Sequence, residues 1–288
     1  MSALHAPVLD WYDEHARDLP WRTESASAWS VLVSEFMLQQ TPVRRVLPVH
    51  QAWLDRWPTP AHLAEEPVGE ALRMWGRLGY PRRALRLHAA ACLIADEHGG
   101  QVPTDHSDLL ALPGVGEYTA AAVASFAFGQ RHVVLDTNVR RVFARAVGGH
   151  EFPANSLNRT ERDLAGCLLP RDAPTAATWA VAVMELGALV CTAKEPNCGV
   201  CPIAQQCSWL RAGRPAHAGS PRRAQGWDGT DRQCRGRLMA VLREAVGPVP
   251  LRRLEAAWPH PEQRARCLVS LVDDGLLVHH DDVSYALP

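Results

Sequence analysis

Apolar residues recur with a helical period along most of the chain, and few segments alternate as β-strands do. From Trp29 to Thr41, apolar side chains cover one face and also flank Glu35 on another. A helix that is apolar all round is a buried helix. We therefore predict an all-α protein. The same period predicts further helices over Val43–Trp57, Pro67–Trp75, Ala84–His98, Ser107–Leu112, Tyr118–Phe128, Asn138–Val147, Arg159–Leu168 and Trp179–Val190.

The C-terminal part has a different pattern. Residues 212–236 are rich in Gly, Pro, Ser and Arg and have no period, which is typical of a linker. Beyond them we predict three short helices and a terminal hairpin, over 237–246, 251–258, 262–273 and 275–288. This is the element order of a winged helix, which serves either as a packing domain or as a nucleic-acid reader.

Charge and composition indicate which classes of protein this chain can belong to. The net charge of -1 over 288 residues says nothing about nucleic acid, but residues 211–237 carry seven Arg against two Asp, a local +5 that polyanions would feel. No apolar run approaches the ~20 residues that a membrane helix needs, and residues 1–9 do not look like a secretory signal. We expect a cytoplasmic protein, in which eight cysteines point to metal binding more than to disulfides.

Four cysteines are spaced closely enough to converge: Cys191, Cys198, Cys201 and Cys207. Turn-forming residues separate them, and four thiolates bind either tetrahedral zinc or an iron–sulfur cluster. Zinc sites usually show two short Cys-x2-Cys pairs, whereas this chain has one. The uneven spacing of six, two and five intervening residues favours a 4Fe-4S cluster.

A tight turn between two predicted helices contains Gly114 and Gly116, in the stretch Leu-Pro-Gly-Val-Gly-Glu-Tyr-Thr-Ala. Its backbone N–H groups, at a helix start, can bind phosphate, although the same residues could form only a helix–helix turn. Two carboxylates are also of interest. Burial would raise the pKa of Glu35, which suits a general acid but also a paired core acid. Asp136 opens a predicted helix, and its position alone favours an N-cap.

Together, these features resemble the helix-hairpin-helix DNA glycosylases, which include endonuclease-III-type enzymes. The finer resemblance is to MutY-type adenine DNA glycosylases. It rests on short motifs between residues 8 and 210: Leu19-Pro20-Trp21, Ser34-Glu35-Phe36-Met37-Leu38-Gln39-Gln40-Thr41, Leu78-Gly79-Tyr80, Leu135-Asp136-Thr137-Asn138-Val139-Arg140-Arg141 and Met184-Glu185-Leu186-Gly187-Ala188.

The resemblance implies a role for each matching residue. Glu35 would protonate the flipped adenine at N7. Asp136 would stabilise the oxocarbenium-like sugar or trap it briefly, and Tyr118 would lie beside that centre. Other matching positions would contact the DNA or line the base pocket. Those implied to contact DNA are Gln40, Tyr80, Gly114, Gly116 and Lys194, and those implied to line the pocket are Trp21, Arg22 and Leu38.

It also implies an architecture. We expect one lobe from residues 1–22 and 131–213 that carries the 4Fe-4S cluster. A six-helix barrel lobe would span 23–130, with the helix-hairpin-helix at about 107–128, and Glu35 and Asp136 would face each other across the cleft between the lobes. An Arg-rich linker over 214–235 and a winged-helix-like domain over 236–288 would follow.

The implied function is base excision repair by a monomeric, nucleoid-associated glycosylase that hydrolyses adenine from duplex DNA when it is mispaired with 8-oxoguanine or guanine. Related strand-cleaving enzymes use a Lys amine where this chain has Tyr118, and its single lysine, Lys194, lies between cluster cysteines. A monofunctional enzyme without strong lyase activity is therefore expected. A thymine/uracil mismatch glycosylase and a non-catalytic iron–sulfur DNA-binding protein are the alternatives.

The chain departs from the MutY pattern in three places. Ala180 and Val181 stand where the family commonly has polar residues facing adenine, which gives the thymine/uracil alternative some weight. Pro81 replaces a second aromatic residue after Tyr80. Residues 226–288 are too short for the NUDIX-like domain with which many MutY-type enzymes read 8-oxoguanine.

Overall fold

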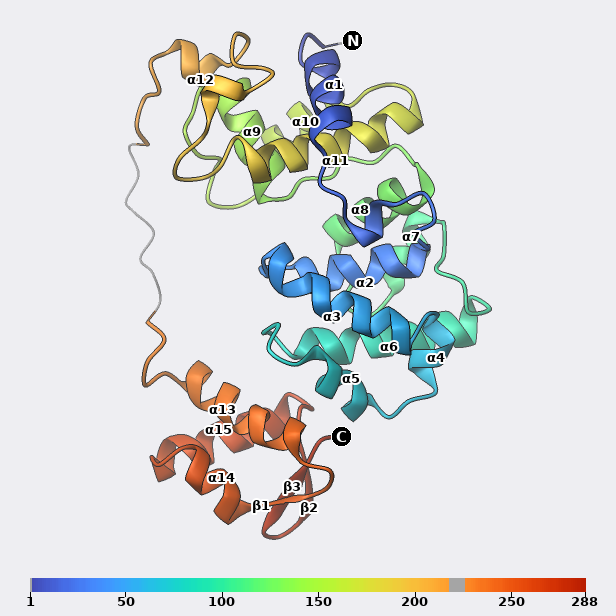
Figure 1. Cartoon of the computed structure of the whole chain (residues 1–288), viewed down its shortest axis with the longest axis vertical. Helices are drawn as coiled ribbons and strands as arrows, with labels where there is room; N and C mark the ends of the chain where they lie inside the picture. The colour runs from blue at the N-terminus through green and yellow to red at the C-terminus, as the bar shows by residue number, and fades with distance from the viewer. Residues whose placement is uncertain (1, 218–225) are drawn as a thin grey trace. The chain divides into compact units, whose positions relative to one another are not determined.

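The computed structural model describes residues 2–217 and 226–288, and this part of the chain is helical apart from one small sheet (Figure 1). It forms two compact units, which are described separately. The first comprises Met1–Leu32, Thr104–Ala111 and Val115–Pro221. The second comprises Val33–Pro103, Leu112–Gly114 and Arg222–Pro288. None of the helices in the described ranges is long and apolar enough to cross a membrane.

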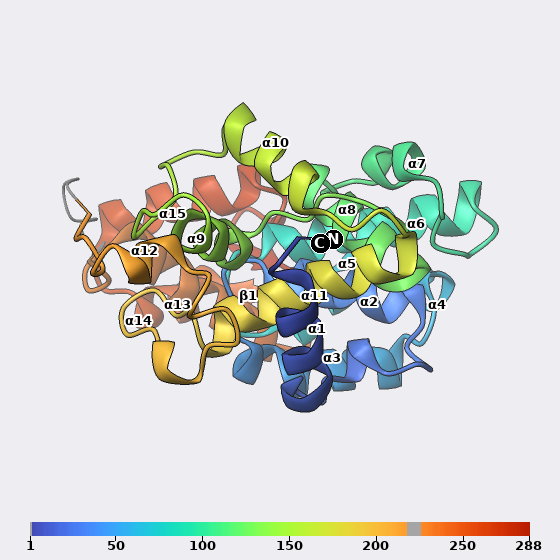
Figure 2. The same ribbon diagram turned by 90° about the horizontal axis from the view of Figure 1, so that it is seen from above.

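The first unit is built around α11 (Ala173–Leu189), against which α1 (His5–His15), α8 (Glu117–Phe128) and α9 (Thr137–Ala146) pack. Figure 2 shows α1 lying across α11. Buried side chains from these helices, such as Val8, Phe143 and Trp179, form its core. The remaining elements of this unit are η1 (Pro20–Arg22), α7 (His106–Ala111), α10 (Arg159–Leu168), η2 (Cys198–Val200) and α12 (Ser208–Arg211).

Side-chain caps fix where three helices of this unit begin. Asp136 caps α9, Asn158 caps α10 in a reciprocal capping box with Glu161, and Asp172 caps α11. Each cap satisfies a backbone N–H that has no partner within its helix. The sequence therefore determines these helix starts locally.

The second unit begins within α2 (Ala28–Leu38), which crosses the boundary between the units. Its core contains a group of tryptophans, in which Trp53 meets Trp57 and Trp75 edge to face at ring-centroid distances of 4.7 and 5.8 Å. The helices around this core are α3 (Val43–Arg56), α4 (Pro60–Ala64), α5 (Val68–Trp75) and α6 (Arg82–Glu97).

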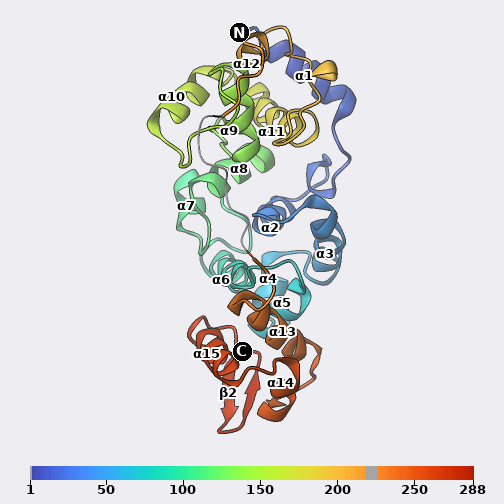
Figure 3. The same cartoon turned by 90° about the vertical axis from the view of Figure 1, so that its left-hand side faces the viewer.

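The C-terminal part of this unit, residues 226–288, has helices α13 (Asp231–Glu244), α14 (Leu251–Ala257) and α15 (Pro261–Asp273), with a three-stranded antiparallel sheet. The strands are β1 (Val249–Pro250), β2 (Val278–Asp281) and β3 (Ser284–Ala286), in the order β1-β3-β2. Helix, strand, two helices and a hairpin follow one another as in a winged helix. Helix α13 packs on α5, so this domain contacts the tryptophan-containing part of its unit (Figure 3).

The structure agrees with the predicted all-α class and differs from the sequence predictions in particular elements. Helices α1 and α4 and strand β1 were not predicted, and α11 begins six residues earlier than expected. Helix α13 begins inside the predicted 214–235 linker, of which residues 218–225 lie outside the described residues. Helix α8 belongs to the first unit and the C-terminal domain to the second, a division that differs from the predicted lobes.

Candidate functional site

Asp136 ends an extended segment and begins α9, and both of its carboxylate oxygens have partners. Oδ1 accepts a hydrogen bond from the backbone N–H of Val139 at 2.7 Å, and Oδ2 accepts one from Nδ2 of Asn138 at 2.7 Å. Burial raises the pKa of Asp136, although these hydrogen bonds and the nearby Arg141 act in the opposite direction. The carboxylate is thus half-buried, held in one orientation and placed where the helix dipole favours negative charge.

A second layer of bonds orients Asn138. Arg141 donates from Nη2 to Oδ1 of Asn138 at 2.8 Å and to the carbonyl of Gly187 at 2.6 Å, and from Nε to the carbonyl of Cys191 at 2.8 Å. A Cβ at Gly187 would lie 2.7 Å from the Cβ of Asn138, so only glycine permits this approach of α9 to α11. A continuous hydrogen-bond chain therefore runs from Asp136 through Asn138 and Arg141 to the first cysteine of the quartet.

The predicted pocket residues Trp21 and Arg22 lie in η1, next to a buried ion-pair network. Glu185 on α11 is fully buried and accepts hydrogen bonds from Arg17 at 2.6 Å and from Arg22 at 3.0 Å. Burial alone would raise the pKa of Glu185, but these bonds outweigh it and lower that pKa to about 2. Nη1 of Arg22 is buried and has no hydrogen-bond partner within the described ranges.

Tyr118, near the start of α8, is half-buried and packs against a small apolar cluster that includes Ala180 of α11. Ala180 is itself buried, and Val181 is half-buried. Ala180 therefore brings apolar surface to the side of α11 that contacts the cluster around Tyr118.

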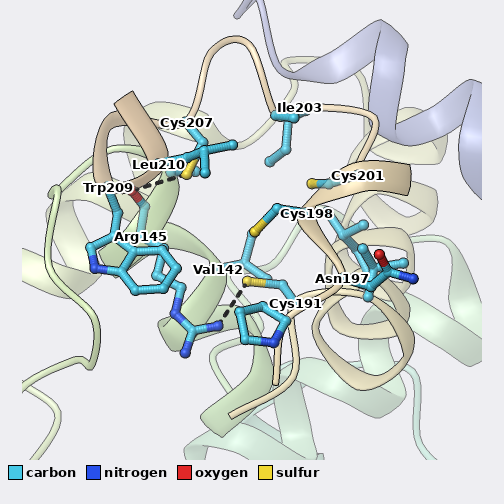
Figure 4. Close-up of a pocket in the computed structure, with 15 residues that line it drawn as sticks. Val142, Arg145, Cys191, Asn197, Cys198, Cys201, Ile203, Cys207, Trp209 and Leu210 are labelled. Atoms are coloured by element: carbon cyan, nitrogen blue, oxygen red, sulfur yellow. Dashed lines mark hydrogen bonds between the residues drawn. The ribbon is translucent and has the colours of Figure 1, made fainter. Parts of the chain in front are cut away.

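The four cysteines line one pocket, where Figure 4 shows their sulfur atoms around a common space. Arg145 of α9 lies beside them and is 1% exposed. It donates to the sulfur of Cys191 at 3.4 Å, and Cys207 donates to its carbonyl at 3.5 Å. It also donates to the carbonyls of Glu151, Thr192 and Ala193.

The chemistry of this pocket fits a group bound by four thiolates. Such a group carries net negative charge, and the guanidinium of Arg145 faces it, with that of Arg141 bonded to the same loop. Within residues 2–217 and 226–288, no three His, Cys, Asp or Glu side chains are close enough to hold one metal ion. Lys194, in the same loop, is exposed.

Glu35 lies on α2 in the second unit and is 5% exposed. Its neighbours in sequence, Phe36 and Met37, are buried with it, whereas Leu38 at the end of the helix is half-buried. The predicted desolvation of Glu35 is therefore present.

Gln40 and Tyr80 share an unusual backbone conformation. Their φ values are 56° and 48°, in the left-handed region that side chains other than glycine and asparagine rarely adopt. Both side chains are exposed, Tyr80 at 54%. Both line one groove of the second unit, between residues 39–86 and the C-terminal domain. The structure thus brings together, on two strained turns, the two residues that the resemblance places in the DNA stack.

One buried residue, Arg83 of α6, holds both turns, and sequence analysis missed it. It is 7% exposed, and its guanidinium lies 5.3 Å from the Trp75 ring centroid and 5.4 Å from that of Tyr80. Burial lowers its pKa to about 10. It donates to Phe36 O (2.7 Å), Met37 O (3.2 Å), Gln39 O (2.6 Å), Thr41 Oγ1 (3.2 Å) and Gly79 O (3.1 Å).

The predicted hairpin glycines have different roles. Gly114 has φ 84°, and a Cβ there would lie 2.7 Å from the Cβ of Arg86 and 3.0 Å from the ring of Phe36. Gly116 is the N-cap residue of α8, with φ -107° and open space around it. Gly114 is therefore required by the turn, whereas Gly116 leaves the first N–H groups of α8 accessible.

The chain is similar to known DNA repair proteins over most of its length. The HhH-GPD superfamily of base excision DNA repair proteins matches residues 33–166. The adenine DNA glycosylase of Mycolicibacterium smegmatis is 51% identical over 289 aligned positions, which cover 100% of this chain and 97% of the relative. The chain belongs to the adenine DNA glycosylase family. This similarity extends over the short C-terminal domain as well.

Two thymine or uracil glycosylases share only part of the chain. The thymine/uracil-DNA glycosylase of Pyrobaculum aerophilum is 36% identical and covers 68% of this chain and 86% of its own length. A solved thermostable thymine-DNA glycosylase superposes with a TM-score of 0.64 at 27% identity, covering 72% of this chain and 94% of that one. The predicted family and the helix-hairpin-helix glycosylase fold are confirmed.

Proposed function

We propose that the protein is a monofunctional adenine DNA glycosylase that removes adenine mispaired with 8-oxoguanine or guanine. The observation that carries this proposal is the full-length identity of 51% to an adenine DNA glycosylase. The Asp136 carboxylate, already oriented at a helix N-terminus, supports the same chemistry.

In the proposed reaction, the bond between C1′ and N9 of the extruded deoxyadenosine breaks, and a water oxygen bonds to C1′. Glu35 gives its proton to N7 of adenine, so that the base leaves as a neutral molecule. Asp136 faces the positive charge that develops on the sugar, and its hydrogen bonds to Val139 and Asn138 hold it ready for that charge. The hydroxyl of the attacking water bonds to the sugar, and the remaining proton of that water returns to Glu35.

Gln40 and Tyr80 would fill the space that the extruded base leaves in the stack, because both are exposed and held on fixed turns. The N–H groups at the start of α8 would bind a DNA phosphate, as would exposed Lys194. Trp21, Arg22 and Leu38 would line the pocket, with Nη1 of Arg22 as its free donor.

Cys191, Cys198, Cys201 and Cys207 would bind a 4Fe-4S cluster, since they line one pocket and arginines face it. The cluster would supply structural cross-linking of the loop over 191–207 and no electron for hydrolysis. Asp136 would be coupled to that loop through Asn138 and Arg141.

The proposal is tested by single-turnover base release from duplexes with adenine opposite 8-oxoguanine, guanine and thymine. We expect release opposite 8-oxoguanine and guanine but not thymine, and no efficient covalent adduct on borohydride reduction, because Tyr118 occupies the position of the lyase lysine. An adduct in high yield would show a lyase instead.

A second candidate is thymine or uracil removal, which the Pyrobaculum relative and the apolar Ala180 favour. Duplexes with thymine or uracil opposite guanine test it in the same experiment. Release from these alone would replace adenine as the substrate.

A further inference from the structure

The second unit has a large groove with one wall from residues 39–86 and the other from the C-terminal domain. Its volume is about 1640 Å³. Exposed arginines line both walls: Arg45, Arg77, Arg82 and Arg86 on the first, and Arg232 and Arg237 of α13 on the second.

The groove has a strong excess of positive charge. The acidic side chains of its lining are Glu244 and Asp274, and Asp274 already binds Arg82 at 3.1 Å and Arg235 at 2.5 Å. Arg77 and Arg237 have no acidic partner within the described ranges. A concave surface of one sign attracts polyanions and raises their local concentration.

Several contacts hold the two walls together. Arg73 of α5 donates to carbonyls at the C-terminal end of α13, those of Arg243 at 2.7 Å and Ala245 at 2.5 Å. A Cβ at Gly69 would lie 2.5 Å from the carbonyl oxygen of Pro288, which shows how closely the chain end packs there. The groove is therefore formed before any partner binds.

The groove also contains features that suit nucleic acid. Gln40 and Tyr80 lie on its lining, and so does Trp227, which is 49% exposed and has the guanidinium of Arg232 5.1 Å from its ring centroid. Arginines bind phosphates through paired N–H groups, and exposed aromatic rings can stack on bases. An acidic protein segment would use the charges but would have no need of these rings.

We propose that this groove binds the phosphodiester backbone of the duplex next to the mispair, so that the C-terminal domain is part of the DNA-binding surface. This inference rests on the proposed function, because it takes mismatched DNA as the substrate. It gives the domain a role in binding, through phosphates and therefore without reading base identity.

The test compares two double variants within the C-terminal domain. Arg232→Gln/Arg237→Gln removes two charges from the groove. Arg252→Gln/Arg253→Gln removes two exposed charges of α14 that are not on its lining. Both pairs lose the same charge and keep helix-forming residues, and thermal unfolding of each variant checks that the fold is retained.

Affinity is measured by fluorescence anisotropy as a function of salt, on a mispaired duplex carrying 2′-fluoro-deoxyadenosine, which resists cleavage. Loss of two phosphate contacts should make the slope of log K against log salt shallower by roughly two and weaken binding about tenfold or more. The α14 variant should bind within about twofold of the wild-type protein.

Equal slopes and affinities for the two variants would overturn the groove proposal. A second outcome would also overturn it: the groove variant binds DNA as tightly as the α14 variant does but no longer binds poly-glutamate. The partner of the groove would then be an acidic protein. Release of unmodified adenine by the wild-type protein is measured in parallel. If the wild-type protein releases none, the proposed function fails, whatever the groove variants show.

Discussion

The start of α9 and the two turns at Gln40 and Tyr80 constrain their functional side chains in opposite ways: the first fixes the side chain, and the second fixes only the backbone. At α9, both oxygens of Asp136 are hydrogen-bonded, and a second layer through Asn138 and Arg141 orients them. At the turns, the side chains are exposed, and the backbone is held in a left-handed conformation by Arg83.

The difference follows from the two tasks that we propose. A carboxylate that stabilises a developing positive charge works best when its environment is already arranged. A residue that enters a DNA stack needs an exposed side chain on a backbone that is held in place. The strained backbone conformation places the side chain there. Variants at the first site should therefore affect chemistry, and variants at the second should affect extrusion of the base.

The largest effect is expected for Asp136→Asn. Asparagine caps a helix about as well as aspartate, so the fold should persist, while the rate of base release falls by roughly 100-fold or more. Asp172→Asn is the matched control, because Asp172 caps α11 in the same way. Single-turnover rates and melting temperatures of both variants check this. An Asp136→Asn protein with the wild-type rate would leave Asp136 as a cap only.

The ion-pair network of Glu185 should dominate the acid sensitivity of the first unit. Its pKa is lowered in the folded state, so its stabilisation is complete above the unfolded value of 4.5 and is lost as pH falls toward about 2. The shift corresponds to about 3 kcal/mol of unfolding free energy. Urea unfolding between pH 7 and 2 should show this loss in the wild-type protein.

In Glu185→Gln, that acid-dependent part should be missing, and the variant should already be less stable at neutral pH because Arg17 and Arg22 lose their partner. Asp163→Asn removes an exposed ion pair with Arg159 and serves as the control. If the Glu185→Gln protein kept the wild-type pH profile, the buried network would not be the source of the acid sensitivity.

Arg83→Met tests whether Arg83 holds the backbone of the two turns at Gln40 and Tyr80 in place. The five acceptors of its guanidinium would lose their donor, Gln40 and Tyr80 would lose their fixed positions, and base release should fall about tenfold or more. Arg44→Met, at an exposed position of α3, should behave as the wild-type protein does. Unchanged release by Arg83→Met would mean that the turns need no support.

The smallest effect, and one of opposite sign, is expected for Gln40→Gly. Glycine adopts positive φ without a steric penalty, so unfolding free energy should rise by up to about 1 kcal/mol, while base release falls because the side chain is gone. Gln39→Gly, at a residue without positive φ, should be destabilised instead. Chemical denaturation of the two variants distinguishes relief of backbone strain at position 40 from the general destabilisation that glycine causes.

Much of this architecture could be predicted from local signals. Helical periodicity located α3, α6 and α8 closely, and the spacing of Cys191 to Cys207 predicted that the four thiols would share one pocket. The capping role of Asp136 also followed from its position before α9.

The remaining features depend on tertiary structure and have no local signature. Arg83, Arg141 and Arg145 are buried by neighbours that are distant in sequence, and an arginine in a helical pattern usually indicates a solvated face. Neither Gln nor Tyr favours positive φ, so residue type could not predict the turns at Gln40 and Tyr80. Strand β1 has two residues and exists only because β3 pairs with it.

The most direct test of this division of labour is stopped-flow fluorescence with 2-aminopurine at the position of the target adenine, since this base fluoresces more when it leaves the stack. Asp136→Asn and Arg83→Met are compared on the same mispaired duplex. We predict that Asp136→Asn retains the rapid fluorescence rise and lacks base release, whereas Arg83→Met loses the rise itself. A normal rise with Arg83→Met, or none with Asp136→Asn, would contradict the assignment of chemistry to α9 and of extrusion to the two turns.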